Sequence, residues 1–266
     1  MPHPFPLTGR VAILTGASAG IGQAVALDLA ARGAGVVLNA RREARLDELA
    51  QRISDQHGLI NGKARAVGVA GDASEDATID AMLGACGEHF GKAADLIVAN
   101  AGRGLSGSVM TSDSDQWEEM IRTNLVGVAK LIRRAGGELL KLNENRDWSE
   151  HPSDIVVLGS TVGRHISPFS SMYGATKFGV NSLAEAARRE LGPKGIRVTL
   201  IEPGIVKSEF QGVAGYDPES FGELMEKYSP VLTPEDVART VGFIVCQPAG
   251  VHLCDVVIRP TRQDYP

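Results

Sequence analysis

A tyrosine and a lysine four residues apart, in the stretch YGATKFGVNSLAEAARREL, have the types and spacing to move a proton. Tyr173 and Lys177 open a segment of helical periodicity, and residues four apart lie on one face of a helix. A phenol loses its proton near pH ~10, but a neighbouring ammonium favours the phenolate. We therefore expect Lys177 to lower the pKa of Tyr173, so that the hydroxyl can act as an acid or base. The alternative is a solvent-facing pair on an amphipathic helix.

A serine hydroxyl precedes this tyrosine by thirteen residues. Ser160 ends the apolar run DIVVLGS, which predicts a buried strand. A hydroxyl at the end of that strand can donate to a substrate carbonyl oxygen while Tyr173 transfers the proton. The alternative is a serine that only caps a turn.

A glycine-rich segment, TGASAGIG from Thr15 to Gly22, directly follows the first apolar run and opens the first helical segment. This is the context of a phosphate-binding turn. Gly16 permits the tight turn, Gly20 lets a pyrophosphate approach the backbone, and Gly22 lets helix and strand pack closely. The alternative is an ordinary turn between a strand and a helix.

The elements that must position these residues form an alternating pattern, in which short runs rich in Val, Ile and Leu are separated by longer segments of helical period. We expect seven strands, in RVAILTG, GVVLNA, ARAVGVA, DLIVANAG, DIVVLGS, IRVTLIEPG and CDVVIRP. Helices are expected near 20–32, 42–56, 75–90, 115–141, 172–191 and 234–246. This order predicts one α/β domain over residues 1–266, a Rossmann-like doubly wound parallel β-sheet of about seven strands with helices on both faces.

Two segments interrupt the alternation. Residues 143–153, NENRDWSEHPS, are polar and contain a proline, so we expect an exposed loop. Residues 205–232 follow the strand ending in IEPG and mix aromatic side chains with charges and glycines. Ligands bind at the carboxyl ends of the strands in such sheets, so we expect this segment to cover the site as a lid. The alternative is an amphipathic excursion that only packs on the body.

Composition argues against several classes of function. The net charge of −5, with both signs interspersed, offers no basic stripe for nucleic acid and no polybasic run for a membrane. The opening MPHPFPLTGR lacks the apolar core of a secretory signal, and no run reaches the ~18 apolar residues of a membrane span. Cys86, Cys246 and Cys254 are too scattered for a disulfide framework or a zinc site. We expect reduced thiols, no metal, and a cytoplasmic enzyme acting on a small molecule.

Five motifs, taken in order, resemble the short-chain dehydrogenase/reductase (SDR) family in its compact single-domain branch. They are TGASAGIG with its GxxxGxG spacing, ANAG at 99–102, Ser160, YGATK, and PG at 203–204. The resemblance covers nearly the whole chain. It implies an oxidoreductase that transfers hydride between NAD(H) or NADP(H) and a carbonyl or secondary alcohol. Tyr173 is then the general acid/base, Ser160 meets the developing alkoxide, and Lys177 also grips the nicotinamide ribose.

The resemblance implies further site residues. Asn124, in RTNLVGV, matches the family asparagine that supports a water-linked proton path, with a packing amide as the alternative. Asp72 is placed near the adenine, with a simple turn residue as the alternative. Cofactor contacts are implied for Gly16, Ser18, Gly20, Ile21, Gly22, Asp72, Asn100, Ala101, Gly102, Tyr173, Lys177, Pro203, Gly204 and Ser208. Two positions depart from the family pattern: Ala99 replaces a frequent asparagine, and Ser208 stands where a threonine is common.

The end of the second expected strand, VVLNARRE, indicates which nicotinamide cofactor is used. NAD sites usually carry an acidic residue there for the ribose 2′-hydroxyl, but this chain has Ala40 followed by Arg41 and Arg42. A guanidinium can hold the 2′-phosphate of NADP through charge-assisted hydrogen bonds. We therefore expect NADP(H), with Arg41 as the main contact and Arg42 as the second. Against this, Ala19 stands where many NADP-preferring relatives carry a basic residue, and both arginines could be solvated residues at a helix start.

Two other functions match parts of the pattern. The extended nucleotide-sugar epimerase and dehydratase branch shares the tyrosine–lysine spacing, but its usual glycine pattern is TGxxGxxG, and this chain has no room for its larger carboxyl-terminal domain. A catalytically silent sensor or scaffold of the same fold would typically have lost a catalytic residue. Here Asn124, Ser160, Tyr173 and Lys177 are all present.

The sequence indicates less about the oligomeric state and the substrate than about the cofactor. Compact members of the family are usually homodimers or homotetramers, built through the helices near 115–141 and 172–191 and the last strand. Within the second helix, Ala184, Ala187 and Leu191 could pack against a symmetry mate, unless they face only their own sheet. The substrate is not specified, since one fold hosts many substrates.

Overall fold

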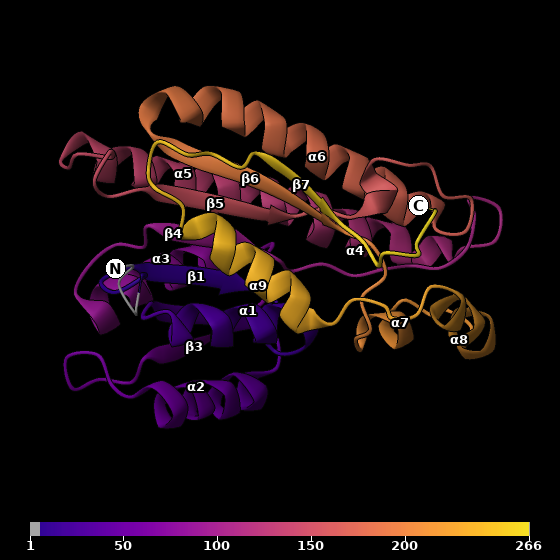
Figure 1. The fold of residues 1–266 in the computed structure, drawn as a ribbon, viewed down its shortest axis with the longest axis horizontal. Helices are drawn as coiled ribbons and strands as arrows, with labels where there is room; N and C mark the ends of the chain where they lie inside the picture. Colours follow the sequence, from indigo (N-terminus) through magenta and orange to yellow (C-terminus); the bar gives the residue numbers. More distant parts are fainter. Residues whose placement is uncertain (1–5, 266) are drawn as a thin grey trace.

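A seven-stranded parallel sheet lies at the centre of the computed structural model, which describes residues 6–265 (Figure 1). The strand order is β3-β2-β1-β4-β5-β6-β7. The strands are β1 Val11–Thr15, β2 Gly35–Ala40, β3 Ala66–Ala70, β4 Leu96–Ala99, β5 Ser153–Leu158, β6 Ile196–Pro203 and β7 Asp255–Ile258. All seven expected strands are therefore confirmed. The expectation that no secretory signal is present rests in part on residues 1–5, which lie outside the described residues.

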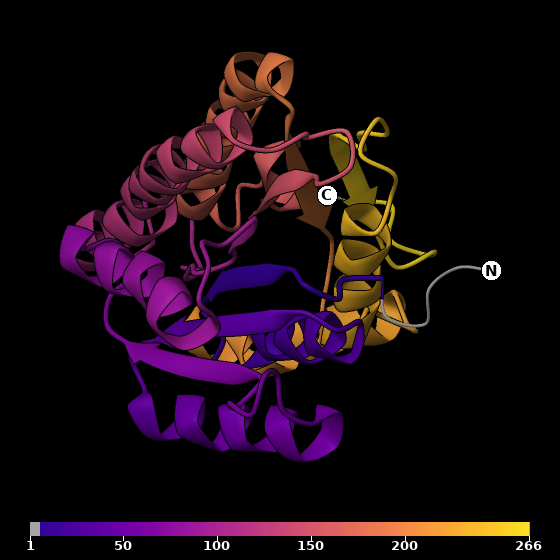
Figure 2. The ribbon, with the colours of Figure 1, turned by 90° about the vertical axis from the view of Figure 1, so that its left-hand side faces the viewer.

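Helices cover both faces of the sheet, as Figure 2 shows in a view turned from that of Figure 1. One face packs against α1 Gly20–Ala31, α2 Glu43–His57 and α9 Pro234–Val245. The other packs against α3 Asp76–Phe90, α5 Gly127–Glu144 and α6 Ser171–Leu191. Successive strand side chains point to opposite faces: Leu14 joins the first layer and Ile13 the second. The doubly wound fold is thus confirmed.

The helix expected over 115–141 is interrupted. The chain forms a 3₁₀ turn at Ser114–Gln116, α4 at Trp117–Ile121, and a π-helical turn at Arg122–Val126 before α5 continues to Glu144. Such π turns often mark functional sites. This one contains Asn124, which is fully buried.

The prediction that the small and apolar side chains of α6 mediate self-association is wrong. Ala184, Ala187 and Leu191 are buried in the core between α6 and the chain's own sheet. Because they lie on the inner face of the helix, they cannot contact a second copy. The outer face carries Phe178 and the ion pairs of Glu185 with Arg188 and Arg189 instead.

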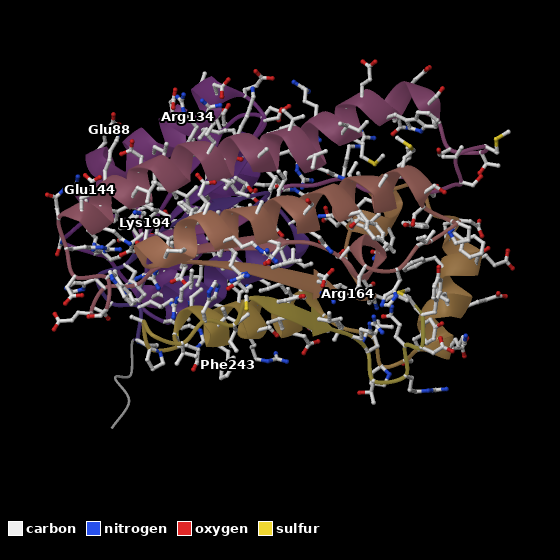
Figure 3. The ribbon with its side chains drawn as sticks, turned by 90° about the horizontal axis from the view of Figure 1, so that it is seen from above. Glu88, Arg134, Glu144, Arg164, Lys194 and Phe243 are labelled. Carbon is white, nitrogen blue, oxygen red and sulfur yellow. The ribbon has the colours of Figure 1, made fainter. Side chains whose placement is uncertain are left out.

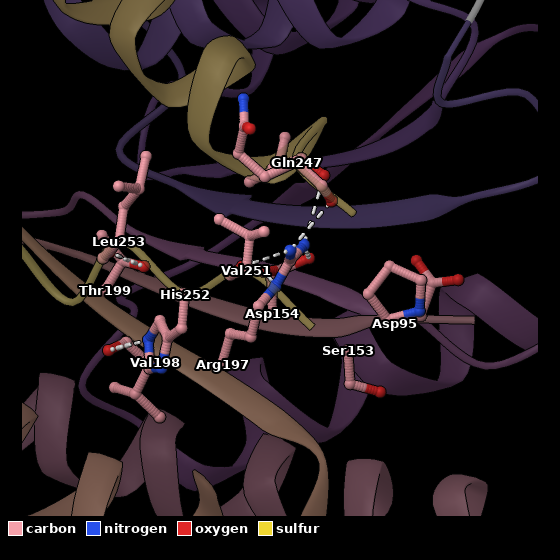
Figure 4. A network of polar contacts seen from close by, with 12 residues as sticks. Asp95, Ser153, Asp154, Arg197, Val198, Thr199, Gln247, Val251, His252 and Leu253 are labelled. Carbon is pink, nitrogen blue, oxygen red and sulfur yellow. Dashed lines mark hydrogen bonds and ion pairs between the residues drawn. The ribbon is translucent and has the colours of Figure 1, made fainter. Parts of the chain in front are cut away.

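A buried network of charges joins the amino ends of the central strands (Figure 4). Arg197 donates to both carboxylate oxygens of Asp154, at 2.7 and 2.9 Å, and Arg10 contacts the same carboxylate at 2.8 Å. Arg10 also donates to Asp95 at 3.0 Å. Arg197 further donates to the carbonyls of Gln247, Pro248 and Val251, in the connection between α9 and β7. The network therefore ties β1, β4, β5, β6 and this connection together, at the sheet end opposite the expected site.

Beyond the carboxyl end of β6, the chain forms α7 Phe210–Val213 and α8 Pro218–Lys227, which project past the sheet (Figure 1). These two helices make up half of the segment expected to act as a lid. Across residues 6–265, the three cysteines are free thiols and no three metal-ligating side chains cluster. In the same residues, no helix has the length and apolar character needed to cross a membrane.

Candidate active site

A cleft of about 880 Å³ opens where the strands end at their carboxyl sides. One part, the nucleotide end, is bounded by the glycine turn and by the residues that follow β2, β3 and β4. The other part, the substrate end, is bounded by the segment after β5, by α7 and α8, and by the carboxyl-terminal residues. Every residue expected at the site except Asn124 lines this cleft.

The glycine turn has the geometry of an anion site. Gly16 adopts the left-handed region, with φ +70°, and a Cβ there would lie 2.9 Å from the Ala101 Cα. A Cβ on Gly22 would lie 2.1 Å from the Gly16 carbonyl oxygen. Among the described residues, no side chain caps the first amides of α1, since the preceding residue is Ala19. These amides and the positive end of the helix therefore favour an anionic group.

The ANAG segment fixes this turn. The Asn100 side chain donates to the carbonyls of Thr15 and Gly16, at 2.9 and 3.2 Å. The Thr15 hydroxyl in turn accepts from the backbone amides of Asn100 and Ala101. Ala99, where relatives often carry a second asparagine, is buried among apolar side chains. The Asn100 amide and the Thr15 hydroxyl therefore hold the turn against the end of β4.

Ser160 and Tyr173 meet at the centre of the cleft. Ser160 caps the 3₁₀ turn Thr161–Gly163, with its hydroxyl accepting from the Val162 amide at 3.4 Å, and the same hydroxyl lies near enough to the Tyr173 phenol to lower its pKa. The tyrosine ring is 8% exposed and tilts against the Phe210 ring, with centroids 5.6 Å apart. The two interpretations of Ser160, a turn cap and a partner of the tyrosine, are therefore compatible.

Lys177 lies beneath this pair. Its ammonium donates to the Leu158 carbonyl at 2.7 Å and lies 5.8 Å from the centroid of the Tyr173 ring. Burial raises the pKa of Tyr173, nearby Tyr216 raises it further, and the Ser160 hydroxyl lowers it. The expectation that Lys177 lowers this pKa stays a prediction, since the ammonium here turns to the β5 backbone. Burial lowers the pKa of Lys177 itself to about 8.

Asn124 lies behind the cleft wall. Its amide donates to the Arg103 carbonyl at 2.8 Å and to the Thr176 hydroxyl at 3.1 Å, and its oxygen accepts from the Arg103 amide at 2.8 Å. These bonds join the segment after β4 to the turn of α6 that carries Lys177. The packing interpretation of Asn124 accounts for these bonds, and its part in a water-linked proton path stays a prediction.

Two arginines follow β2 at the nucleotide end. Arg41 is 72% exposed and contacts Glu119 at 3.4 Å. Arg42 donates to the Ser18 hydroxyl at 2.8 Å and approaches Glu209 at 3.7 Å, so it bridges the glycine turn and the start of α7. Both residues line the cleft, and their contact with the 2′-phosphate of a bound cofactor stays a prediction.

Asp72 has the hydrogen bonds of a turn residue, and its contact with the adenine stays a prediction. It accepts hydrogen bonds from the Ser74 amide and hydroxyl, at 2.9 and 2.8 Å, as a turn residue does. It also lines the nucleotide end of the cleft and pairs with Arg122 at 3.0 Å.

Several cleft residues have no motif in the sequence. Glu119 bridges Arg41 and Arg103. Gln263 and Tyr265 enter from the carboxyl-terminal tail: the Gln263 oxygen accepts from the Ile205 amide at 2.9 Å, and the Tyr265 hydroxyl donates to the Ile166 carbonyl. These residues lie outside the sequence motifs and far apart in the chain. Only their polar or aromatic side chains could have suggested that they belong to the site.

Comparisons with known proteins agree with this geometry. A family model described as short chain dehydrogenase matches residues 10–217. A protein of Staphylococcus epidermidis described as an oxidoreductase is 33% identical over 251 residues, which cover 94% of this chain and 97% of that protein.

Two solved structures have the same fold. An alcohol dehydrogenase from the archaeon Thermococcus sibiricus, complexed with 5-hydroxy-NADP, has a TM-score of 0.80 and 26% identity, covering 97% of this chain and 99% of that one. A 3-ketoacyl-(acyl-carrier-protein) reductase from Brucella melitensis, complexed with NADH, has a TM-score of 0.82 and 27% identity, covering 96% and 99%. Such structures thus include complexes with both kinds of nicotinamide cofactor.

Proposed function

The chain belongs to the short-chain dehydrogenase/reductase family, and from this premise we propose that it is an NADP(H)-dependent oxidoreductase of the cytoplasm. It interconverts a carbonyl group and a secondary alcohol. One observation carries the proposal: the Ser160–Tyr173 pair lies above buried Lys177, in the same cleft as the uncapped start of α1. A proton donor and an anion site therefore share one binding space.

The residues present fit a dinucleotide. The amides at the start of α1 can bind a pyrophosphate, and a Cβ on Gly16 or Gly22 would clash with the turn itself, so both glycines keep the turn tight. By family resemblance, Lys177 holds the nicotinamide ribose. When bound, the cofactor supplies or accepts a hydride with its electron pair.

Proton transfer is the part of the reaction that the chain performs. Because burial raises its pKa, Tyr173 is protonated at neutral pH and can give its proton to the oxygen of a carbonyl as that carbon is reduced. Ser160 donates a hydrogen bond to the same oxygen and so stabilises the developing alkoxide. The reverse steps oxidise an alcohol.

Nicotinamide fluorescence tests this function against that of a silent sensor. We would screen ketones, aldehydes and secondary alcohols with NADPH and NADP⁺. Turnover of at least one carbonyl–alcohol pair is expected. Tight cofactor binding without turnover of any compound in a broad panel would favour the sensor.

Arg41→Ala should weaken NADPH binding by roughly ten- to a hundredfold and barely change NADH binding. A hydrogen bond to a charged group contributes about 1.5–3 kcal/mol, and only NADPH carries the 2′-phosphate. Arg45→Ala is the matched control, because Arg45 lies nearby on α2 and pairs with Glu209 but does not line the cleft. Titration by fluorescence quenching would measure both cofactors. Equal weakening for NADPH and NADH, or a wild-type preference for NADH, would contradict the assignment.

Self-association into a homodimer or homotetramer is also proposed, now through the β7 edge of the sheet. Phe243 on α9 is 59% exposed and Val257 on β7 is 40% exposed, and Figure 3 shows Phe243 at the outer side of α9. β7 pairs with β6 on one side and forms the edge of the sheet. Light scattering at micromolar concentration should give a dimer or tetramer, and Phe243→Asp should shift it toward the monomer. A wild-type monomer would contradict the proposal.

A further inference from the structure

The substrate end of the cleft has aromatic walls. Its lining includes six aromatic side chains besides Tyr173, contributed by the segment after β5, by α7 and α8 with their flanking residues, and by the tail: Phe169, Phe210, Tyr216, Phe221, Tyr228 and Tyr265. Aromatic side chains supply large apolar area and stack on flat groups.

The aromatic wall beside the catalytic tyrosine is held in place. The Phe210 ring lies 5.6 Å from the Tyr173 ring, and a Cβ on Gly104 would come within 2.5 Å of the Phe210 Cζ. The backbone of the segment after β4 therefore packs directly against the ring. Ser106 adds two hydrogen bonds to the α7 segment, from its amide to the Ala214 carbonyl at 2.9 Å and from its hydroxyl to the Gly215 carbonyl at 2.7 Å.

The charges of the cleft are divided unequally between its two ends. Among the described lining residues, the cations are Arg41, Arg42, Arg103 and Lys177. Arg41 and Arg42 follow β2 at the nucleotide end, and Glu119 joins Arg103 to Arg41. Lys177 is buried beneath the tyrosine with its ammonium on the β5 backbone. No cation among the lining residues is therefore left to pair with an acidic group on the substrate.

An acidic side chain stands at the substrate end instead. Asp217 caps α8, accepting from the Ser220 amide at 2.9 Å and its hydroxyl at 2.6 Å, and it lines the cleft. Other polar residues that line the substrate end are uncharged, such as Ser167, Ser170 and Tyr216. A carboxylate or phosphate on the substrate would lose its hydration without gaining a cationic partner, and it would approach a like charge.

We propose that the substrate is an uncharged ketone, or the corresponding alcohol, with an aryl group next to the reacting carbon, and that Phe210 selects it by stacking. This inference rests on the proposed function. In the reductive direction the hydride and its electron pair pass from NADPH to the ketone carbon and the proton passes from Tyr173 to the oxygen, giving the alcohol and NADP⁺.

A binding experiment tests the pocket without any turnover. Acetophenone and benzoate have nearly the same shape, and neither can be reduced by protein loaded with NADP⁺. By calorimetry, acetophenone should bind the NADP⁺-loaded protein at least about tenfold more tightly than benzoate. Asp217→Asn, which keeps a capping side chain, should narrow this difference by improving benzoate binding. Equal binding of the two ligands, tighter benzoate binding, or no binding of acetophenone would overturn the inference.

A kinetic experiment separates this inference from the proposed function. Ethyl benzoylformate and benzoylformate share the same aryl ketone, but only the second carries a carboxylate. With NADPH, kcat/KM for the ester should exceed that for the acid by at least about tenfold. Reduction of the acid at an equal or greater rate would overturn the inference and leave the oxidoreductase function intact. If acetophenone is preferred in binding but no carbonyl compound is ever reduced, the pocket assignment stands as a ligand site and the proposed function fails.

Phe210 variants test the selecting side chain. Phe210→Ala should lower acetophenone affinity and kcat/KM for the ester about tenfold or more, while NADPH binding stays near the wild-type value. Phe210→Leu keeps apolar volume without the flat ring, so it should restore reduction of a bulky alkyl ketone more than that of the aryl ester. Unchanged selectivity in both variants would show that Phe210 does not select the substrate.

Discussion

Tyr173→Phe should lower turnover by about 10²–10⁴-fold and leave NADPH binding nearly unchanged. The substitution removes the hydroxyl that gives the proton, while the ring that packs against Phe210 is retained. The cofactor contacts argued above come from the glycine turn, from Arg41 and from Lys177, so the phenol contributes little to affinity. Steady-state NADPH oxidation would measure turnover, and fluorescence titration would measure binding.

Two variants serve as controls for this experiment. Tyr265→Phe removes a phenol hydroxyl from the same cleft, but that hydroxyl bonds to the Ile166 carbonyl and is not placed to donate a proton. Its effect on turnover should be small. Lys177→Met should weaken both turnover and cofactor binding, because the ammonium supports the centre of the cleft and is proposed to hold the ribose. Activity of Tyr173→Phe within a few-fold of the wild type would refute the assignment of Tyr173.

Asp154→Ala should lower the free energy of unfolding by about 3–5 kcal/mol. Asp154 is almost completely buried and is the carboxylate that Arg10 and Arg197 share. Removing it leaves two guanidinium groups in the interior, with Arg197 held only by backbone carbonyls. Urea denaturation followed by circular dichroism would measure the loss.

Glu185→Ala is the control for burial. Glu185 also pairs with two arginines, Arg188 and Arg189, but on the exposed face of α6. Such exposed pairs are screened by solvent and contribute little, so this variant should unfold close to the wild type. A similar loss of unfolding free energy in both variants would show that burial does not determine how much the Asp154 network contributes to stability. The folded fraction of Asp154→Ala should keep its turnover, since the network lies at the opposite end of the sheet from the cleft.

The strands and most helices could be predicted because their periodicity reflects burial directly. Runs such as VAILT and LIVA are buried at every position, as expected for strands covered on both faces. The π turn at Arg122–Val126 could not be predicted, because one extra residue in a turn scarcely changes the periodicity of a helix. Small residues were similarly ambiguous: Ala184 and Ala187 fit an inner face as well as an outer one, and packing decided between them.

The positions of the site residues along the backbone were predictable. The glycine turn, ANAG and the Ser160–Tyr173 spacing place residues at strand ends, and the sheet brings them into one cleft. Side-chain directions were not predictable. The spacing of Tyr173 and Lys177 placed them on one helix, but the Leu158 carbonyl, on another element, receives the ammonium. Residues such as Glu119 and Tyr265 reach the cleft only through the tertiary fold.

The contacts of Arg10 bear on the order in which the chain can fold during synthesis, because its partners are synthesised long after it. Asp154 follows Arg10 by 144 residues, and Val245, whose carbonyl accepts from Arg10 at 3.3 Å, follows by 235. A ribosome adding roughly 5–20 residues per second delivers Asp154 some 7–30 s after Arg10. Until then the guanidinium has no carboxylate from β5, and burying it would be costly. Asp95 offers Arg10 a first carboxylate after 85 residues, so the amino end of β1 can be buried in two steps, and the second step waits for Asp154.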